Sequence, residues 1–315
     1  MKINEGLKRK LLIGGLGVLG IALLIGLFFI VSSFLSKNKE ETTNENPVAF
    51  DLMTYNPEKR FLKVNDKKLK LGKSEKVFSK RGNVYVYDES TKTLSLINEN
   101  LEKSELGTLD DEPVLADRNQ DKVVVKTKQN TIFSFGFESS NNIAEKLKGV
   151  EVKDFAIDKD DVFYIEEDKG KTVLSSTNSS TLQRIPNLSS ISILGDKVLV
   201  SSGYGMKGNQ TIAILNKSLR GLDLLSFKAD ELELVNNNAD RACFKDGKNL
   251  QIFDIRTNKM ISLNNVGDME NNAISLDQNL VYTIKDDKLY IRDLKTAEIK
   301  ETRDVEAGSV IVQVR

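Results

Sequence analysis

The side chains that could carry chemistry in this sequence are mainly carboxylates, because its 315 residues include no His and a single Cys. The absence of His excludes the His-based triads, His-ligated metals and His general bases of many hydrolases and metalloenzymes. One Cys can form neither an internal disulfide nor a Cys-rich zinc site. Cys243 lies in the apolar run Ala242-Cys243-Phe244, and with no His to activate it we expect a buried thiol rather than a nucleophile.

The acidic residues show no pattern that singles out a reaction. The run Asp158-Lys159-Asp160-Asp161 lacks the Gly and the distal Glu of an EF-hand loop, so it predicts a hairpin turn. Paired carboxylates can hydrolyse glycosides, but no spacing here marks one pair. We therefore expect no catalytic residue, metal or cofactor. A membrane-bound carbohydrate-active enzyme that uses loop carboxylates is the alternative.

Charge is unevenly distributed along the chain, although 46 basic and 46 acidic residues cancel overall. Residues 1–10 carry four basic residues against one acid, and residues 11–35 carry no charge. A helix of these 25 residues would be about 37 Å long, enough to cross a hydrocarbon core of about 30 Å. A cleaved signal peptide would have a shorter apolar region of about 7 to 15 residues. We therefore expect a transmembrane helix over 11–35 that acts as an uncleaved signal anchor.

The position of the basic residues predicts the topology of this anchor. Because positive charge favours the cytoplasmic side, residues 1–10 should form a cytoplasmic tip and everything after residue 35 should lie outside the cytoplasmic membrane, in the periplasm or extracellular space. Residues 36–47 are polar and should form a flexible tether. Within the helix, Gly14, Gly17 and Gly20 recur every three residues and could dock another membrane helix. Alternatively, they reflect the general abundance of Gly in membrane helices.

Downstream of Pro47 the sequence consists of short apolar runs separated by Asp, Asn, Gly and Lys, which is typical of short strands. The runs repeat in phase at intervals of 36 to 41 residues, and each interval holds up to four of them. The first strand of each unit begins at Val77, Val114, Phe155, Ile191, Leu232, Ala273 and Val310. A regular period of this length predicts a repeat architecture rather than a two-sheet sandwich.

Two of these units share a motif. Residues 250–257 and 289–296 both fit the pattern L-x-I-x-D-[IL]-[RK]-T. This motif resembles the third strand of a blade in WD40-like and YVTN-like β-propellers, with Phe253 and Arg292 at the position of the WD tryptophan. The resemblance covers nearly all of the chain after the tether and implies an all-β domain of four-stranded antiparallel blades.

The ends of this domain predict how the ring closes. Residues 310–314 fit the first strand of a unit, and three strands at about 50–55, 61–64 and 68–71 could complete that unit. We therefore expect residues 48–315 to form a seven-bladed β-propeller that leaves no open sheet edge. Rings of six or eight blades are the alternatives.

Loops of this propeller supply the candidate binding residues. The loops that lead into each first strand are rich in acids and could meet a basic partner, or they could be ordinary solvated loops. Their candidate residues are Asp110, Asp111, Glu112, Asp230, Glu231, Asp268 and Glu270. A Gly-rich loop over 201–210 adds Tyr204 and Met206 as candidate contacts.

These features predict a membrane-anchored, non-enzymatic scaffold in a bacterial cell-envelope complex, such as a secretion, pilus or wall-associated assembly. Its expected partners are other membrane or envelope proteins and, through residues 11–35, the lipid bilayer. The neutral net charge gives no field for nucleic acid. Besides the carbohydrate-active enzyme, a ligand-binding sensor subunit is an alternative.

Overall fold

The computed structural model describes residues 52–138, 142–202, 209–228, 232–238, 240–246, 249–264 and 272–314. The chain divides into two compact units, Met1–Ala49 and Phe50–Arg315, and the fold described here is that of the second. The predicted transmembrane helix, the tether, and Gly14, Gly17 and Gly20 lie outside the described residues. Within the described ranges, no helix has both the length and the apolar character needed to cross a bilayer. The domain boundaries at residues 10, 35 and 47 stay predictions.

Strands in the second unit form seven antiparallel sheets, here called blades. Blade 1 contains β4 (Glu75–Lys80), β5 (Asn83–Asp88), β6 (Thr93–Ile97) and β7 (Lys103–Thr108). Blade 2 contains β8 (Pro113–Asn119), β9 (Lys122–Thr127) and β10 (Ile132–Phe135). Blade 3 contains β11 (Val152–Asp158), β12 (Asp161–Asp168), β13 (Lys171–Ser176) and β14 (Ser179–Arg184).

The remaining blades follow the same order along the chain. Blade 4 contains β15 (Leu188–Leu194), β16 (Lys197–Ser202), β17 (Asn209–Asn216) and β18 (Asp223–Lys228). Blade 5 contains β19 (Glu233–Asn237), β20 (Arg241–Asp246), β21 (Asn249–Asp254) and β22 (Lys259–Leu263). Blade 6 contains β23 (Asn272–Ser275), β24 (Leu280–Lys285), β25 (Lys288–Asp293) and β26 (Ile299–Asp304).

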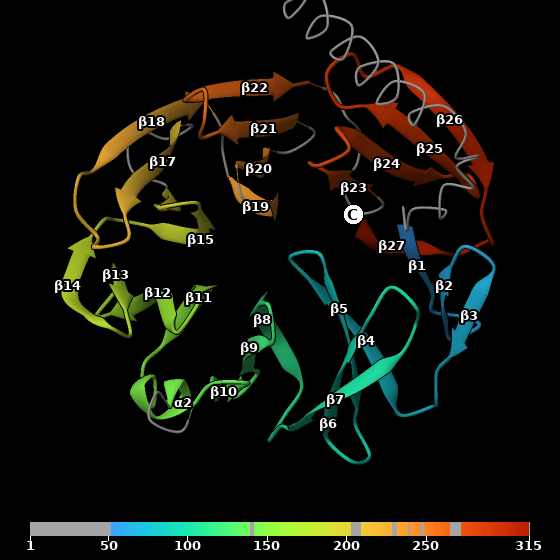
Figure 1. The fold of residues 1–315 in the computed structure, drawn as a ribbon, viewed down its shortest axis with the longest axis horizontal. Helices are drawn as coiled ribbons and strands as arrows, with labels where there is room; N and C mark the ends of the chain where they lie inside the picture. Colours follow the sequence, from blue (N-terminus) through green and yellow to red (C-terminus); the bar gives the residue numbers. More distant parts are fainter. Residues whose placement is uncertain are drawn as a thin grey trace, which may run out of the picture. The chain divides into compact units, whose positions relative to one another are not determined.

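Blade 7 combines strands from both ends of the unit, in the order β27 (Val310–Val314), β1 (Leu52–Asn56), β2 (Phe61–Val64) and β3 (Lys67–Lys70). β27 pairs with β1 in an antiparallel register that places Thr54 opposite Ile311. The seven blades surround a common axis, with the first strand of each nearest to it (Figure 1). The predicted seven-bladed β-propeller is confirmed, and rings of six or eight blades and the two-sheet sandwich are excluded.

Blade 2 differs from the prediction of four strands in every unit. Among its described residues it has three strands, and β10 is followed by the short helix α2 (Ile143–Lys146), whose N-cap Asn142 accepts a hydrogen bond from the Glu145 N–H. The physical reason is the spacing of the apolar side chains. Ile143 and Leu147 are four residues apart, which is the helical period, and both are buried against β8 and β11.

The core is divided among the interfaces between blades. In the described residues there are seven apolar clusters, and each fills the space between one pair of neighbouring blades. Successive side chains of a strand point to opposite faces, so each blade presents an apolar face to both neighbours. The second strands are accordingly buried on both sides, as in Val84-Tyr85-Val86-Tyr87 of β5.

The motif shared by blades 5 and 6 has a structural role in the turn after the third strand. The Asp254 carboxylate accepts the N–H groups of Arg256 and Thr257, both at 3.0 Å. Asp293 accepts the N–H groups of Lys295 at 2.8 Å and Thr296 at 3.1 Å. Because a carboxylate that bonds the backbone two and three residues ahead closes a tight turn, the motif stabilises the hairpin to the fourth strand.

Candidate functional site

Three of the predicted partner-binding residues, Asp110, Asp111 and Glu112, are described by the structure. They lie between β7 and β8, on a loop that leads into the first strand of blade 2, and all three are partly buried. The other candidate loop residues lie outside the described residues: Tyr204, Met206, Asp230, Glu231, Asp268 and Glu270. The structure therefore brings together only the three consecutive acids.

Lysines contact this acidic loop and pair with one of its three carboxylates, Glu112. Glu112 forms an ion pair with Lys128 and a longer one of 3.6 Å with Lys76. Lys92 Nζ donates a hydrogen bond of 2.6 Å to the Asp110 carbonyl oxygen. The hydrogen bond from Lys128 and the positive charge of Lys76 hold the pKa of Glu112 below its ordinary value. A basic partner would have to displace these lysines, so this loop is a weaker acidic surface than its sequence indicates.

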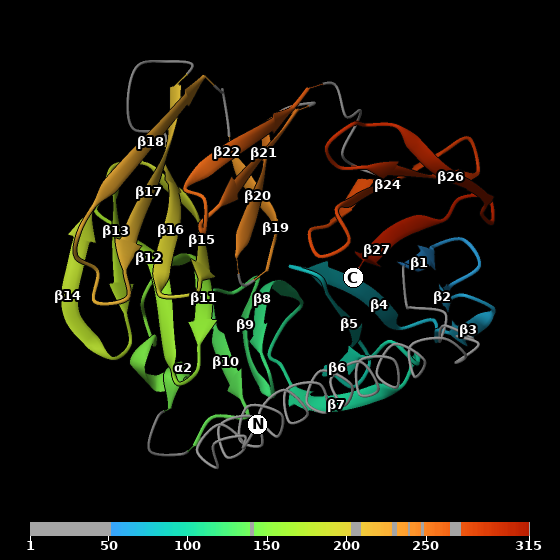
Figure 2. The same ribbon diagram turned by 45° about the horizontal axis from the view of Figure 1, so that its top comes forward.

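A buried cation lies near the axis of the ring instead. Arg81 occupies the turn between β4 and β5, and this hairpin extends toward the axis in both ribbon views (Figures 1 and 2). Its guanidinium nitrogens lie 2.6 Å from Asp154 Oδ2 and 3.5 Å from Asp117 Oδ2. It also donates to the Ile191 carbonyl at 2.9 Å and to that of Phe155. Arg81 thus joins blade 1 to blades 2, 3 and 4.

The two carboxylates also bond the backbone of the next blade. Asp117 accepts the Ile157 N–H at 2.8 Å, and Asp154 accepts the Ile191 N–H at 2.9 Å. Burial raises the pKa of both carboxyls, and the positive charge of Arg81 acts against that rise. The side chain of Arg81 is only 6% exposed and that of Asp154 only 8%. We define Arg81, Asp117 and Asp154 as the ion cluster.

On the other side of the axis, side-chain amides make the corresponding contacts between blades. The Asn236 amide donates to the Ile274 carbonyl at 2.5 Å, from blade 5 to blade 6. The Gln313 amide donates to the Gly82 carbonyl at 2.5 Å, from blade 7 to blade 1. These neutral contacts leave no buried charge that needs a counter-ion.

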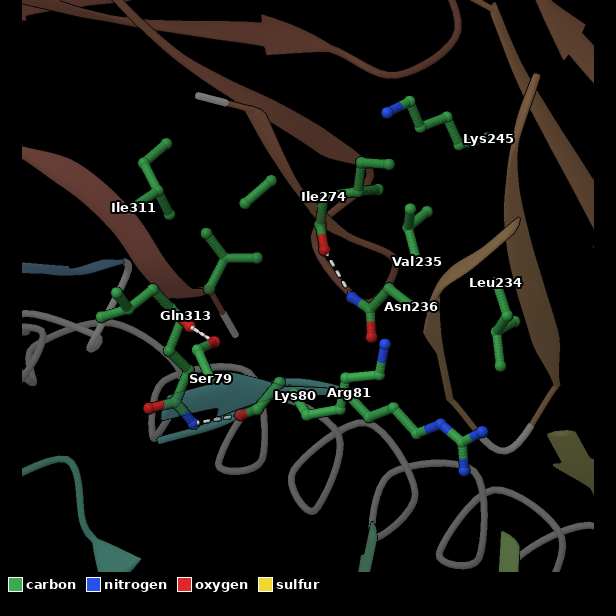
Figure 3. Close-up of a pocket in the computed structure, with 14 residues that line it drawn as sticks. Ser79, Lys80, Arg81, Leu234, Val235, Asn236, Lys245, Ile274, Ile311 and Gln313 are labelled. Atoms are coloured by element: carbon green, nitrogen blue, oxygen red, sulfur yellow. Dashed lines mark hydrogen bonds between the residues drawn. The ribbon is translucent and has the colours of Figure 1, made fainter. Parts of the chain in front are cut away.

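Two cavities lie along the axis, and Arg81 lines both. One has a volume of about 300 Å³ and lies among β4, β19, β23 and β27 (Figure 3). The other, of about 380 Å³, lies among β8, β11, β15 and the end of β19. We call the first the cation cavity, because Lys80 and Lys245 line it together with Arg81. In the described ranges, no group of three or more His, Cys, Asp or Glu side chains is arranged to hold a metal ion.

The sequence prediction missed this axial site, although one signal pointed to it. The turns between the first and second strands of other blades carry an acid, such as Asp121, Asp160 and Asp196, whereas the turn of blade 1 carries Arg81. The acid is the second residue of each of these two-residue turns, where blade 1 has Gly82, so Arg81 has no counter-charge within its own turn. The sequence could not show that this turn extends toward Asp117 and Asp154.

Comparisons with known proteins agree with the fold. No protein-family model and no curated protein matches the sequence. Among solved structures, KlAtg21 in complex with the coiled coil of AgAtg16 is 14% identical, with a TM-score of 0.51 over 82% of this chain and 99% of that one. Apo AztD from Citrobacter koseri is 12% identical, with a TM-score of 0.44 over 81% of this chain and 78% of that one.

A third similar structure is a catalytically inactive virginiamycin B lyase from Staphylococcus aureus with quinupristin. It is 13% identical, with a TM-score of 0.45 over 76% of this chain and 88% of that one. At these identities the comparisons bear on the fold alone. By its own seven blades, residues 52–314 of this chain form a β-propeller.

Proposed function

We propose that the chain is a membrane-anchored β-propeller that acts outside the cytoplasm as a non-enzymatic protein-interaction scaffold in a bacterial cell-envelope complex. The uncharged segment 11–35 behind a basic tip supports the anchor and its orientation. The tether 36–47 has a random-coil reach of only about 20 Å. The propeller would therefore act close to the membrane surface.

The observation that carries the binding role is a pair of exposed apolar side chains at the start of the outer strand of blade 4. Leu222 and Leu224 are 45% and 48% exposed, and residues two apart in a strand point to the same face. Leu182 of β14 in blade 3 is also 48% exposed, but it points to the opposite face from Gln183, whose amide donates a 2.7 Å hydrogen bond to the Leu219 carbonyl of blade 4. Clustered exposed apolar side chains on a soluble surface are typical of a protein-binding site.

The strand β18 adds a second means of binding. It is the last strand of its sheet, so one row of its backbone N–H and C=O groups has no partner in the blade. An extended segment of a partner could pair with this edge while its apolar side chains cover Leu222 and Leu224. KlAtg21, which has a similar fold, holds a protein partner in its solved complex. That complex supports the use of such a ring as a platform.

The test is a pull-down of the full-length chain from gently solubilised membranes, compared with the double variant Leu222→Ser/Leu224→Ser. We expect a co-purifying envelope protein with the wild type and its loss with the variant. Ile299→Ser is the matched control, because Ile299 is 54% exposed on the outer strand of blade 6. A chain that is solitary in every preparation, or a partner retained equally by all variants, would contradict the proposal.

A further inference from the structure

The cation cavity takes no part in the proposed scaffold role. Its walls come from four inner strands, each at one end of its own sheet: β4, β19, β23 and β27. Edge strands keep one row of backbone N–H and C=O groups that is not used in sheet pairing. Leu234, Ile274 and Ile311 contribute apolar wall (Figure 3). The cavity therefore combines backbone hydrogen-bonding groups with an apolar surface.

The charge of this cavity is one-sided. Lys80, Arg81 and Lys245 line it, and no Asp or Glu does so among the described residues. Arg81 already has counter-charges in Asp117 and Asp154. Lys80 and Lys245 form no ion pair with any carboxylate whose side chain the structure describes. Lys245 and, beyond its longer-range attraction to Asp154, Lys80 thus place positive charge in a partly enclosed space, where attraction to an anion is stronger than in bulk water.

Polar side chains in the wall are held in place before any ligand arrives. The Asn236 amide is fixed by the Ile274 carbonyl and the Gln313 amide by the Gly82 carbonyl. Ser79 donates its hydroxyl to the Val312 carbonyl. Because these bonds cross between blades, they fix the width of the cavity, and binding costs little reorganisation.

We propose that the cation cavity binds a small organic anion, with Lys80 and Lys245 neutralising its charge and Ile274 and Ile311 contacting its aliphatic part. A cavity of about 300 Å³ holds roughly ten water molecules at about 30 Å³ each, which limits the ligand to a small carboxylic acid or phosphate ester. The lack of any described acid in the wall selects against cations. This site is independent of the proposed scaffold surface, which lies on the outer strand of blade 4.

The experiment measures binding to the full-length chain in detergent micelles by titration calorimetry and thermal shift. The probes are citrate, glycerol phosphate and inorganic phosphate at constant ionic strength. We expect saturable binding of at least one probe and a higher Tm in its presence. Lys80→Ala and Lys245→Ala should each weaken the affinity at least tenfold. Lys259→Ala, on the exposed outer strand of blade 5, should leave it unchanged.

The choice of probe distinguishes the ligand classes. Preference for citrate indicates a carboxylate ligand, and preference for glycerol phosphate over inorganic phosphate indicates a phosphate ester. Lys80→Gln and Lys245→Gln separate loss of charge from loss of folding, since their Tm without ligand should equal that of the wild type. Equal affinity in the Lys80, Lys245 and Lys259 variants, or no saturable binding of any probe, would overturn the proposal.

Discussion

Side-chain amides join neighbouring blades on both sides of the propeller axis, as Asn119 does with the Ile157 carbonyl at 3.2 Å, but the ion cluster adds buried charge on one side. On one side, Asp117 and Asp154 accept backbone N–H groups of the next blade. On the other, the amides of Asn236 and Gln313 donate to backbone carbonyls of the next blade. Both arrangements join inner strands that no sheet pairing connects.

The two arrangements differ in whether they need a counter-charge. A buried carboxylate needs a cation nearby. Blade 1 supplies Arg81, whose charge is neutralised by Asp117 and Asp154 and is therefore not available to a ligand. A neutral amide needs none. Lys80 and Lys245, which line the cavity on that side, form no ion pair with a described carboxylate, although the charge of Lys80 also acts on the buried Asp154. On the charged side, Arg81 and the two carboxylates therefore neutralise one another, whereas on the neutral side lysine charge remains for a ligand.

The largest expected effect comes from breaking the charged side. Asp154→Ala removes the closest counter-charge of Arg81 and leaves the Ile191 N–H without its acceptor. Breaking a buried pair by removal of one partner costs about 3–5 kcal/mol. For a domain of this size that lowers Tm by roughly 6–20 °C. Thermal unfolding followed by circular dichroism measures this change.

The matched control is Lys148→Ala, which removes one partner of an exposed ion pair with Glu145. Exposed pairs contribute about 0–1 kcal/mol, so its Tm should stay close to that of the wild type. Asp154→Asn keeps an acceptor for the Ile191 N–H and should lie between the two. If Asp154→Ala unfolds at the temperature of the Lys148 variant, the ion cluster does not stabilise the ring.

A smaller effect is expected on the neutral side. Asn236→Ala deletes the hydrogen bond to the Ile274 carbonyl and the one that its amide oxygen accepts from the Asn237 N–H, without leaving a buried charge. The net worth of each such bond is about 0.5–1.5 kcal/mol. Denaturant unfolding should therefore show a smaller loss than that of Asp154→Ala. A loss equal to it would mean that the two sides of the axis are equivalent.

The strands of both sides could be predicted from the sequence, but their contacts across the axis could not. Short apolar runs such as Val198-Leu199-Val200 show which segments are strands, because burial on both faces imposes that composition. Arg81 and Ile191 are 110 residues apart, and their contact depends on how far one hairpin extends from its blade. The sequence also did not predict that the described residues of blade 2 form three strands and a helix, since the helical spacing of Ile143 and Leu147 spans barely one turn.

The cation cavity shows the same limit of sequence reasoning. Lys245 belongs to the second strand of blade 5, which the repeat places behind the inner strand, yet it lines an axial cavity. Its contribution depends on the position of blade 5 relative to blades 6, 7 and 1. A periodic pattern specifies which face of a strand is buried, but it does not specify how far each blade lies from the axis.

The smallest expected effect concerns blade 7, where the ion pairs of Glu306 are exposed to solvent, unlike those of the buried ion cluster. Glu306 lies between β26 and β27, 2.6 Å from Lys59 Nζ and 2.7 Å from Lys68 Nζ. Hydrogen bonds from these two lysines lower the pKa of Glu306 to about 2. Its stabilising contribution is therefore complete above the unfolded-state pKa of about 4.3 and is lost as the pH falls toward about 2.

Glu306→Gln should thus leave a slightly lower Tm at pH 7 and remove part of the decline in Tm below pH 4.5, because Gln does not titrate. Asp66→Asn, a change in the exposed turn between β2 and β3 of the same blade, is the control and should leave the acid decline unchanged. Thermal unfolding at a series of pH values from 7 to 2.5 measures both variants. If the Tm of Glu306→Gln were lower than that of the wild type by the same amount at every pH, the charge of Glu306 would not contribute to stability. The ion pairs of Glu306 would then contribute no more than the neutral contacts of blade 7, whereas the ion cluster at Arg81 would stabilise the ring through buried charge.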